Sequence, residues 1–195
     1  MFYPAIPSSI AGKGDKKYKT MTLSFSQNWP ERMGELAGQP NFFAEKIWQS
    51  LMDNKISEYI DYRNYEILFD DKFDRYWDGS RTIFNSKLHT IREDKSNRWK
   101  AGNDIHMVIN NRTKDRFQFA PVVKCVSVQY IEISHTSLSR KNFSKPFVKV
   151  DGKYLLYSEM KSLALNDGFP SVEAFFQYFN KDFKGKIIHW TDLKY

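Results

Sequence analysis

The order of hydrophobic patterns along the chain constrains its fold more than any other feature. Strand-like segments dominate residues 81–157, whereas apolar residues recur at helical spacing on either side of this region. Phe43, Ile47 and Leu51, for example, are four residues apart, as in a helix with one buried face. Strands do not alternate regularly with helices, so a doubly wound parallel sheet is not expected. The sequence therefore predicts an α+β fold, in which mostly antiparallel strands form a small barrel or curved sheet with flanking helices.

Turn and cap residues set the bounds of the predicted segments. Asn41 is expected to cap the first helix. Gly168 is expected to end the helix at 158–166, and Gly185 to end the helix at 171–183. Helices are predicted after Asn41 and at 56–62, 158–166 and 171–183, with a strand or helix end at 65–69. Strands are predicted at 23–26, 82–84, 87–92, 105–109, 147–150, 153–155 and 186–190, and across a long run at 117–133 that bends near Pro121.

A chain of 195 residues is long enough for one large domain. Residues 1–20 are small, charged and basic toward their end, and are predicted to form a flexible leader. Residues 21–195 then form a single domain. Within it, 21–80 are an N-terminal elaboration, and 81–195 are the barrel core with its closing helices.

Cysteine and hydropathy patterns bear on the compartment. Cys125 is the single cysteine, so no intramolecular disulfide and no cysteine-based zinc site can form; we expect it to be a buried thiol. The N-terminus lacks the features of a secretory signal, and no run of 18 apolar residues occurs. We therefore expect a cytoplasmic protein with no membrane partner.

The charge favours an anionic partner without proving one. The net charge is +7, the pI is near 9.3, and aromatic residues make up 16% of the chain. Residues 87–116 hold eight Lys or Arg against four Asp or Glu, and a second basic cluster lies within 140–153. Nucleic acid and nucleotide phosphates suit such a surface, although solvated lysines alone would also explain it. Since the four histidines are isolated in sequence, we expect no metal and no cofactor.

The densest candidate site is the segment Lys87-Leu88-His89-Thr90-Ile91-Arg92. A hydroxyl needs a neighbouring base to become a nucleophile, a lysine with a lowered pKa can act as that base, and arginine binds phosphate or carboxylate. An exposed strand edge would favour the same residue types. In a regular strand Lys87 and Thr90 lie on opposite faces, so they meet only if the backbone turns or bulges.

This segment, followed by Arg98-Trp99-Lys100-Ala101-Gly102-Asn103-Asp104-Ile105, resembles the motif of the ASCH domain superfamily, a Gly-x-Lys-x-x-Thr-x-Arg pattern followed by an aromatic residue and a Gly-Asp turn. Leu163-Ala164-Leu165-Asn166-Asp167-Gly168-Phe169 is similar to the family's acidic-Gly-Phe junction. Gly38 to Ile47 is similar to N-terminal pieces of ASCH-like proteins from phages and prophages. Ser86 stands where the motif has its first glycine.

The resemblance implies a PUA-like β-barrel whose cleft suits RNA, nucleotides or modified nucleosides. Some small members of the family are amidohydrolases that remove acetyl from acetylcytidine. Carried over by motif, the proposed catalytic residues are Lys87, Thr90 and Asp167, and Arg92 contacts the substrate.

Three hypotheses follow for the function. The first is an RNA- or nucleotide-binding module with a basic cleft at the motif. The second is a hydrolase of acylated nucleosides, with Thr90 as nucleophile, Lys87 as base and Asp167 as acid. The third is a protein-interaction domain with a vestigial cleft; the oligomeric state is left open. The ligand-binding side chains expected under the first are Arg92, His89, Trp99 and Lys100, and Trp99 is also a candidate core residue.

Overall fold

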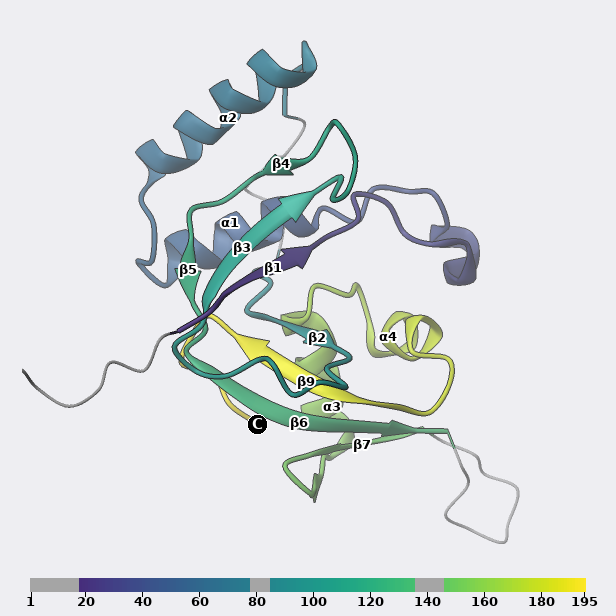
Figure 1. The fold of residues 1–195 in the computed structure, drawn as a ribbon. Helices are drawn as coiled ribbons and strands as arrows, with labels where there is room; N and C mark the ends of the chain where they lie inside the picture. The colour runs from purple at the N-terminus through teal and green to yellow at the C-terminus, as the bar shows by residue number, and fades with distance from the viewer. Residues whose placement is uncertain (1–17, 78–84, 136–145) are drawn as a thin grey trace, which may run out of the picture.

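The computed structural model describes residues 18–77, 85–135 and 146–195. Its elements are arranged in two sheets with helices packed against them (Figure 1). The helices are η1 (Glu31–Leu36, 3-10), α1 (Phe43–Asp53), α2 (Tyr59–Phe73), α3 (Tyr157–Asn166) and α4 (Val172–Tyr178). The strands are β1 (Thr20–Ser24), β2 (His89–Arg92), β3 (Asp104–Ile109), β4 (Phe117–Gln118), β5 (Val123–Lys124), β6 (Ser127–Ser134), β7 (Phe147–Val150), β8 (Lys153–Tyr154) and β9 (Phe183–His189).

The two sheets differ in strand direction. The first has the order β1-β3-β4, with β5 also pairing to β3, and its β1–β3 pair is parallel. The second, in the order β2-β9-β6-β7-β8, is antiparallel throughout. The predicted α+β class with mostly antiparallel strands is confirmed. Among the described residues, neither sheet closes into a barrel.

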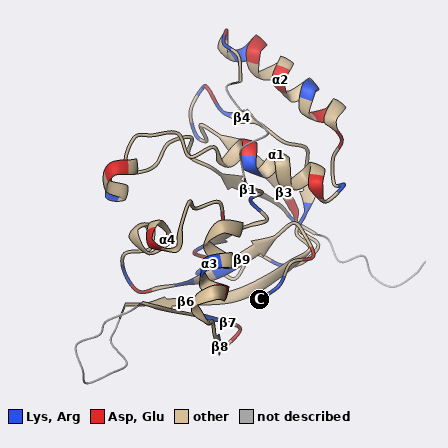
Figure 2. Cartoon of the chain, turned by 180° about the vertical axis from the view of Figure 1, so that it is seen from behind, with Lys and Arg blue, Asp and Glu red and all other residues tan. Residues whose placement is uncertain are grey.

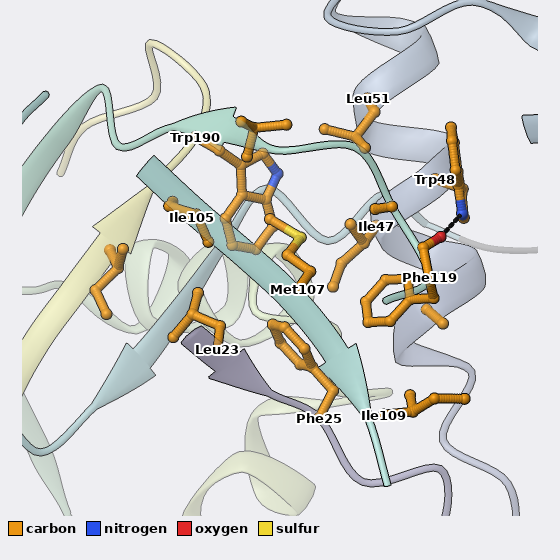
Figure 3. Packing of buried hydrophobic residues seen from close by; sticks show 14 of the residues in the cluster. Leu23, Phe25, Ile47, Trp48, Leu51, Ile105, Met107, Ile109, Phe119 and Trp190 are labelled. Atoms are coloured by element: carbon orange, nitrogen blue, oxygen red, sulfur yellow. Dashed lines mark hydrogen bonds between the residues drawn. The ribbon is translucent and has the colours of Figure 1, made fainter. Parts of the chain in front are cut away.

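A separate hydrophobic cluster packs on each sheet. The first lies between the β1–β3 pair and α1, where Ile47 and Leu51 point from α1 toward the strand that carries Met107 (Figure 3). Trp48, on another side of α1, donates a hydrogen bond from Nε1 to the Phe119 carbonyl at 2.6 Å. The second cluster joins the antiparallel sheet to η1, α3 and α4. β1 and α1 supply residues of the first cluster and η1 supplies Met33 to the second, so these three elements are integral to the packing.

Three predicted segments are corrected by the structure. Residues 59–73 form one continuous helix, α2, in place of a short helix at 56–62 followed by a separate strand or helix end at 65–69, because the helix buries Tyr62 and Phe69 on one face. The last helix ends at Tyr178, and Phe183 begins β9. Gly185 lies inside β9, where an added Cβ would come within 2.5 Å of the Arg92 carbonyl, so this glycine permits close strand pairing and does not end a helix.

Other predicted segments are found near their expected places. The long run at 117–133 is divided into β4, β5 and β6, with Pro121 between β4 and β5 and a second break at 125–126. The Asn41 side chain accepts a hydrogen bond from the Phe43 amide at 3.0 Å, at the start of α1. The predicted strand at 82–84 and residues 1–17 of the predicted leader lie outside the described residues. Lys19, also assigned to that leader, accepts a hydrogen bond from the Asp104 amide at 3.0 Å and so adjoins the first sheet. Within the described ranges, no helix combines the length and hydropathy that a membrane crossing requires.

Candidate functional site

The centre of the candidate site is a buried ion pair between Lys87 and Asp167. Lys87 Nζ lies 2.5 Å from Asp167 Oδ1 and also donates to the Asp167 carbonyl. The two residues are 1% and 3% exposed. The Ile91 backbone favours the charged form of the same carboxylate and so lowers its pKa, against the effect of burial. Eighty residues separate the partners in sequence, so the fold brings together the two motif segments that carried the resemblance.

Local backbone geometry fixes this pair. The Lys87 amide donates to the Lys46 carbonyl on α1 at 3.0 Å, and the Leu88 amide donates to the Asn166 carbonyl at the end of α3 at 2.8 Å. Gly168 adopts φ +88°, which turns the chain directly after Asp167. The Lys87 ammonium also lies 4.7 Å from the centre of the Phe43 ring. Lysine at the C-terminal end of a helix is favoured by the helix dipole.

Burial shifts both ionisation equilibria. Desolvation lowers the pKa of Lys87 to about 8, although Asp167 opposes the shift. Burial raises the pKa of Asp167, and Lys87 opposes that shift. Lys46, which donates to the Gly168 carbonyl at 2.7 Å, has its pKa lowered to about 8 by burial as well. Two lysines with lowered pKa values therefore bind carbonyl oxygens just after α3.

His89 and Thr90 lie on opposite faces of β2, as strand alternation predicts. His89 Nδ1 is 3.7 Å from Asp167 Oδ1, so His89 shares the side of the ion pair. Thr90 is 1% exposed, and its Oγ1 has no hydrogen-bond partner among the described residues. Of the three expected catalytic residues, the structure places Lys87 and Asp167 in contact, and no hydrogen bond joins Thr90 to them.

A buried group of His89, His189 and Tyr195 lies next to the Lys87–Asp167 ion pair. His89 Nε2 is 2.7 Å from the Tyr195 hydroxyl, and the ring of His189, its cross-strand neighbour on β9, lies 5.3 Å away. Both histidines are 0% exposed. Burial lowers the pKa of His189 to about 4 and lowers the pKa of His89 well below its usual value. His89 is thus enclosed and offers no exposed side chain to a ligand, contrary to the expectation from sequence.

This cluster predicts a loss of stability in acid. The unfolded chain binds a proton at His189 near pH 6.5 and the folded chain only near pH 4, so the free energy of unfolding falls as the pH drops between these values. From this single histidine the fall between pH 7.5 and pH 5 is about 2 kcal/mol. Urea unfolding at the two pH values measures it. His189→Leu, which removes the titrating group, should lose about 2 kcal/mol less than the wild type; equal losses would contradict the assignment.

Arg92 connects the buried centre to a surface pocket. Its guanidinium donates to the Ser24 carbonyl at 3.0 Å and to the Ile91 carbonyl at 3.2 Å, and lies 5.1 Å from the Phe25 ring centre. These bonds use two of the five guanidinium N–H donors. Asp167 and Tyr178 both interact with its charge. Arg92 is therefore held in place while donors remain for a ligand.

The pocket, called here the Arg92 pocket, is basic and partly aromatic. Its charged lining residues are Arg32, Arg92, Lys181, Glu93 and Asp182. The Arg32 guanidinium stacks 4.1 Å from the Tyr178 ring centre, and Arg32 and Lys181 are exposed. Its lining also includes the buried apolar residues Ile91 and Phe179. Lys87, Thr90 and Asp167 do not line it.

The other two residues predicted to contact a ligand, Trp99 and Lys100, lie in different places, and neither lines the Arg92 pocket. Trp99 is 5% exposed and belongs to the first hydrophobic cluster, so the core interpretation holds and ligand stacking does not. Lys100 is exposed but lines another pocket, with Tyr18 and Arg98. In the second basic cluster, residues 140–145 lie outside the described residues. Cys125 is buried as expected, and burial raises the pKa of its thiol to about 11.

Sequence reasoning did not find several residues near the site. Arg32, Tyr178 and Lys181 come from η1, α4 and the loop before β9, and no sequence motif links them to Arg92. A second buried ion pair, Lys186 with Asp94 at 3.0 Å, was also missed, because a lysine within an apolar strand gives no sign of its partner.

Metal chemistry has no candidate ligand set here: residues 18–77, 85–135 and 146–195 contain no group of three or more side chains of the metal-binding kinds. What the geometry offers instead is a buried Lys87–Asp167 ion pair and, separately, an arginine that backbone carbonyls hold at a basic pocket. Comparisons of this chain with protein-family models, curated proteins and solved structures found no match.

Proposed function

We propose that the protein binds RNA or nucleotides through phosphate contacts in the Arg92 pocket. The observation that carries this proposal is the position of Arg92. Its guanidinium is held by the Ser24 carbonyl and the charge of Asp167, yet lines a pocket that also contains Arg32 and Lys181. A prepositioned guanidinium loses little conformational freedom on binding and offers a planar fork to phosphate oxygens.

The aromatic lining suits a nucleotide better than a bare anion. Tyr178 presents its ring beside Arg32, and an arginine–aromatic surface can stack on a nucleobase while neighbouring cations contact the backbone. Glu93 and Asp182 also line the pocket, so its excess of positive charge is small. Binding to any one phosphate is therefore expected to be weak, and several contacts along a strand would be needed for useful affinity.

The ASCH resemblance and its PUA-like barrel are part of the same proposal. The contact between Lys87 and Asp167 supports the resemblance, because the motif segment and the acidic junction segment meet in space. The mainly antiparallel sheets with helices on their faces are compatible with an elaborated barrel of that type. Here β1, α1 and η1 add to the core that the motif implies.

Direct binding of RNA tests the proposed function. A fluorescein-labelled single-stranded RNA of 12 nucleotides is titrated with protein between 25 and 200 mM salt, and anisotropy gives Kd. If about three cations contact phosphate, the slope of log K against log salt is about −2. The same titration with single-stranded DNA, and competition by CTP and GTP, separate RNA from nucleotide recognition. No binding at 25 mM salt, or an affinity independent of salt, would overturn the proposal.

Hydrolysis of acylated nucleosides is the alternative, and two observations favour testing it. Thr90 Oγ1 is buried without a partner among the described residues, and the pKa of Lys87 is lowered to about 8. Against it, Lys87 Nζ is engaged by Asp167. Incubation with acetylcytidine, followed by chromatography for cytidine, decides: turnover that Thr90→Ala abolishes supports hydrolysis, and no turnover by the wild type excludes this substrate.

The third possibility, an interaction domain with a vestigial cleft, draws support from the burial of Lys87, Thr90 and Asp167. It predicts neither RNA binding nor turnover, so the two experiments above distinguish all three functions.

A further inference from the structure

Tyr130 is an exposed aromatic residue on β6 that lies in line with Arg92. Arg92 on β2 pairs with Lys186 on β9, and Lys186 pairs with Tyr130 on β6. Residues directly opposite each other on neighbouring strands project from the same face of a sheet, so these three form one row. Figure 1 shows β2, β9 and β6 side by side. Since neighbouring strands are about 4.8 Å apart, the backbones of Arg92 and Tyr130 are about 10 Å apart.

Tyr130 is held in position by its backbone and by a cation on its ring. Its amide donates to Asp151 Oδ1 at 2.8 Å, and its carbonyl accepts from the Asp151 amide at 2.9 Å. Lys186 Nζ lies over the ring, 5.5 Å from its centre, and is itself fixed by Asp94 at 3.0 Å and by the Trp99 carbonyl at 3.0 Å. Tyr130 nevertheless remains 60% exposed. It therefore presents a prepositioned aromatic surface to solvent, which loses little conformational freedom on binding.

The pocket beside this ring, called here the Tyr130 pocket, adjoins the Arg92 pocket, because Glu93 lines both. Each lysine of its lining is paired with an acidic residue of the same lining: Lys95 with Glu93 at 3.2 Å, Lys184 with Glu132 at 3.5 Å, and Lys186 with Asp94. Figure 2 likewise shows both signs of charge on the strands and loops of the second sheet. Among the described residues, this lining thus has no net charge, which suits an uncharged planar group better than a phosphate.

We propose that Tyr130 is a base-stacking residue for single-stranded RNA, and that the phosphate joining two nucleotides lies at Arg92. Stacking on Tyr130 rests on the proposed function, because it needs that phosphate contact. The base on one side of the phosphate stacks on Tyr178 in the Arg92 pocket, and the base on the other side stacks on Tyr130. A duplex keeps its bases stacked and paired, and a mononucleotide cannot occupy both rings. The substrate class is therefore a single strand of at least two consecutive nucleotides.

Anisotropy titration of the labelled 12-nucleotide RNA tests this role with the full chain. Tyr130→Ala should weaken binding about tenfold at 50 mM salt, as expected for the loss of one stacked base, whereas Tyr130→Phe keeps the ring and should bind like the wild type. Tyr157→Ala is the matched control and should also bind like the wild type. Tyr157 is 62% exposed on α3, which packs against the other face of the same sheet. Thermal unfolding checks that the three variants are folded, as expected for exposed positions.

Two further measurements separate stacking from backbone contact. Stacking releases no counterions, so the slope of log K against log salt should stay at about −2 in Tyr130→Ala. An abasic strand of 12 nucleotides, which has the phosphates but no bases, should bind the wild type and Tyr130→Ala equally. A slope that falls in Tyr130→Ala, or equal losses on the RNA and the abasic strand, would assign Tyr130 to the backbone and overturn stacking.

Failure of stacking on Tyr130 is distinguishable from failure of the proposed function. Salt-dependent RNA binding that Tyr130→Ala leaves unchanged would overturn stacking on Tyr130 and leave the Arg92 pocket in place. A wild type that does not bind RNA at 25 mM salt would overturn both.

Discussion

Arg92→Gln is expected to weaken binding of the single-stranded RNA by at least tenfold at 50 mM salt. The substitution removes a cation that is held by backbone carbonyls and lines the pocket. A charge-assisted fork to phosphate is worth more than a single neutral hydrogen bond, and a loss of 1.4 kcal/mol corresponds to the tenfold change. Anisotropy titration of the labelled RNA measures the effect.

Two companion measurements separate this loss from a loss of structure. Arg92→Lys keeps the charge but not the fork, so its affinity should lie between those of the wild type and Arg92→Gln. Thermal unfolding of both variants checks the hydrogen bond to Ser24 and the packing on Phe25. Binding of Arg92→Gln at wild-type affinity would remove Arg92 from the site.

Lys87→Met is expected to lower the free energy of unfolding by about 3–5 kcal/mol at pH 7.5, a large share of the 5–15 kcal/mol typical of a domain. The change leaves the Asp167 carboxylate buried without its cation, and the Asp167 carbonyl loses a donor. Asp167 can relieve the first cost by taking a proton, since burial already raises its pKa. The difference between variant and wild type should therefore shrink as the pH falls toward 5.5. Urea unfolding at both pH values measures it.

Lys124→Met is the matched control for this prediction. Lys124 pairs with Asp104 at 2.6 Å, but its side chain is 63% exposed, so the loss should stay below about 1 kcal/mol. If Lys87→Met were no more destabilising than Lys124→Met, the buried pair would not be an important stabilising contact.

Local patterns predicted much of the fold. The helical spacing of Phe43, Ile47 and Leu51 predicted α1, and Gly168 predicted the end of α3, because both signals depend on residues close in sequence. The predicted helix at 171–183 was too long for the same reason, because it was inferred from local spacing alone. Phe175, Phe179 and Phe183 all face the second cluster, but the chain changes from helix to strand between the last two, and side-chain spacing does not reveal that change.

Site residues could be predicted from the sequence only where they belong to a recognisable motif segment. The motif residues Lys87 and Arg92 were identified directly, and the resemblance led to Asp167 as the partner of Lys87. Arg32 and Lys181 were not identified, because their proximity to Arg92 depends on how η1 and the α4–β9 loop pack. The parallel pairing of β1 with β3 was missed on similar grounds, since it joins residues more than 80 positions apart.

The salt dependence of RNA binding in three proteins tests most directly whether the Arg92 pocket is the phosphate-binding surface. The wild type is compared with Arg32→Gln/Lys181→Gln, which removes two pocket cations, and with Arg116→Gln/Lys153→Gln, which removes two exposed cations outside the pocket. The Arg92 pocket predicts that the slope of log K against log salt falls from about −2 to about −0.7 in the first double variant and stays near −2 in the second. Equal slopes in the two double variants would show that diffuse surface charge, and not this pocket, holds the RNA.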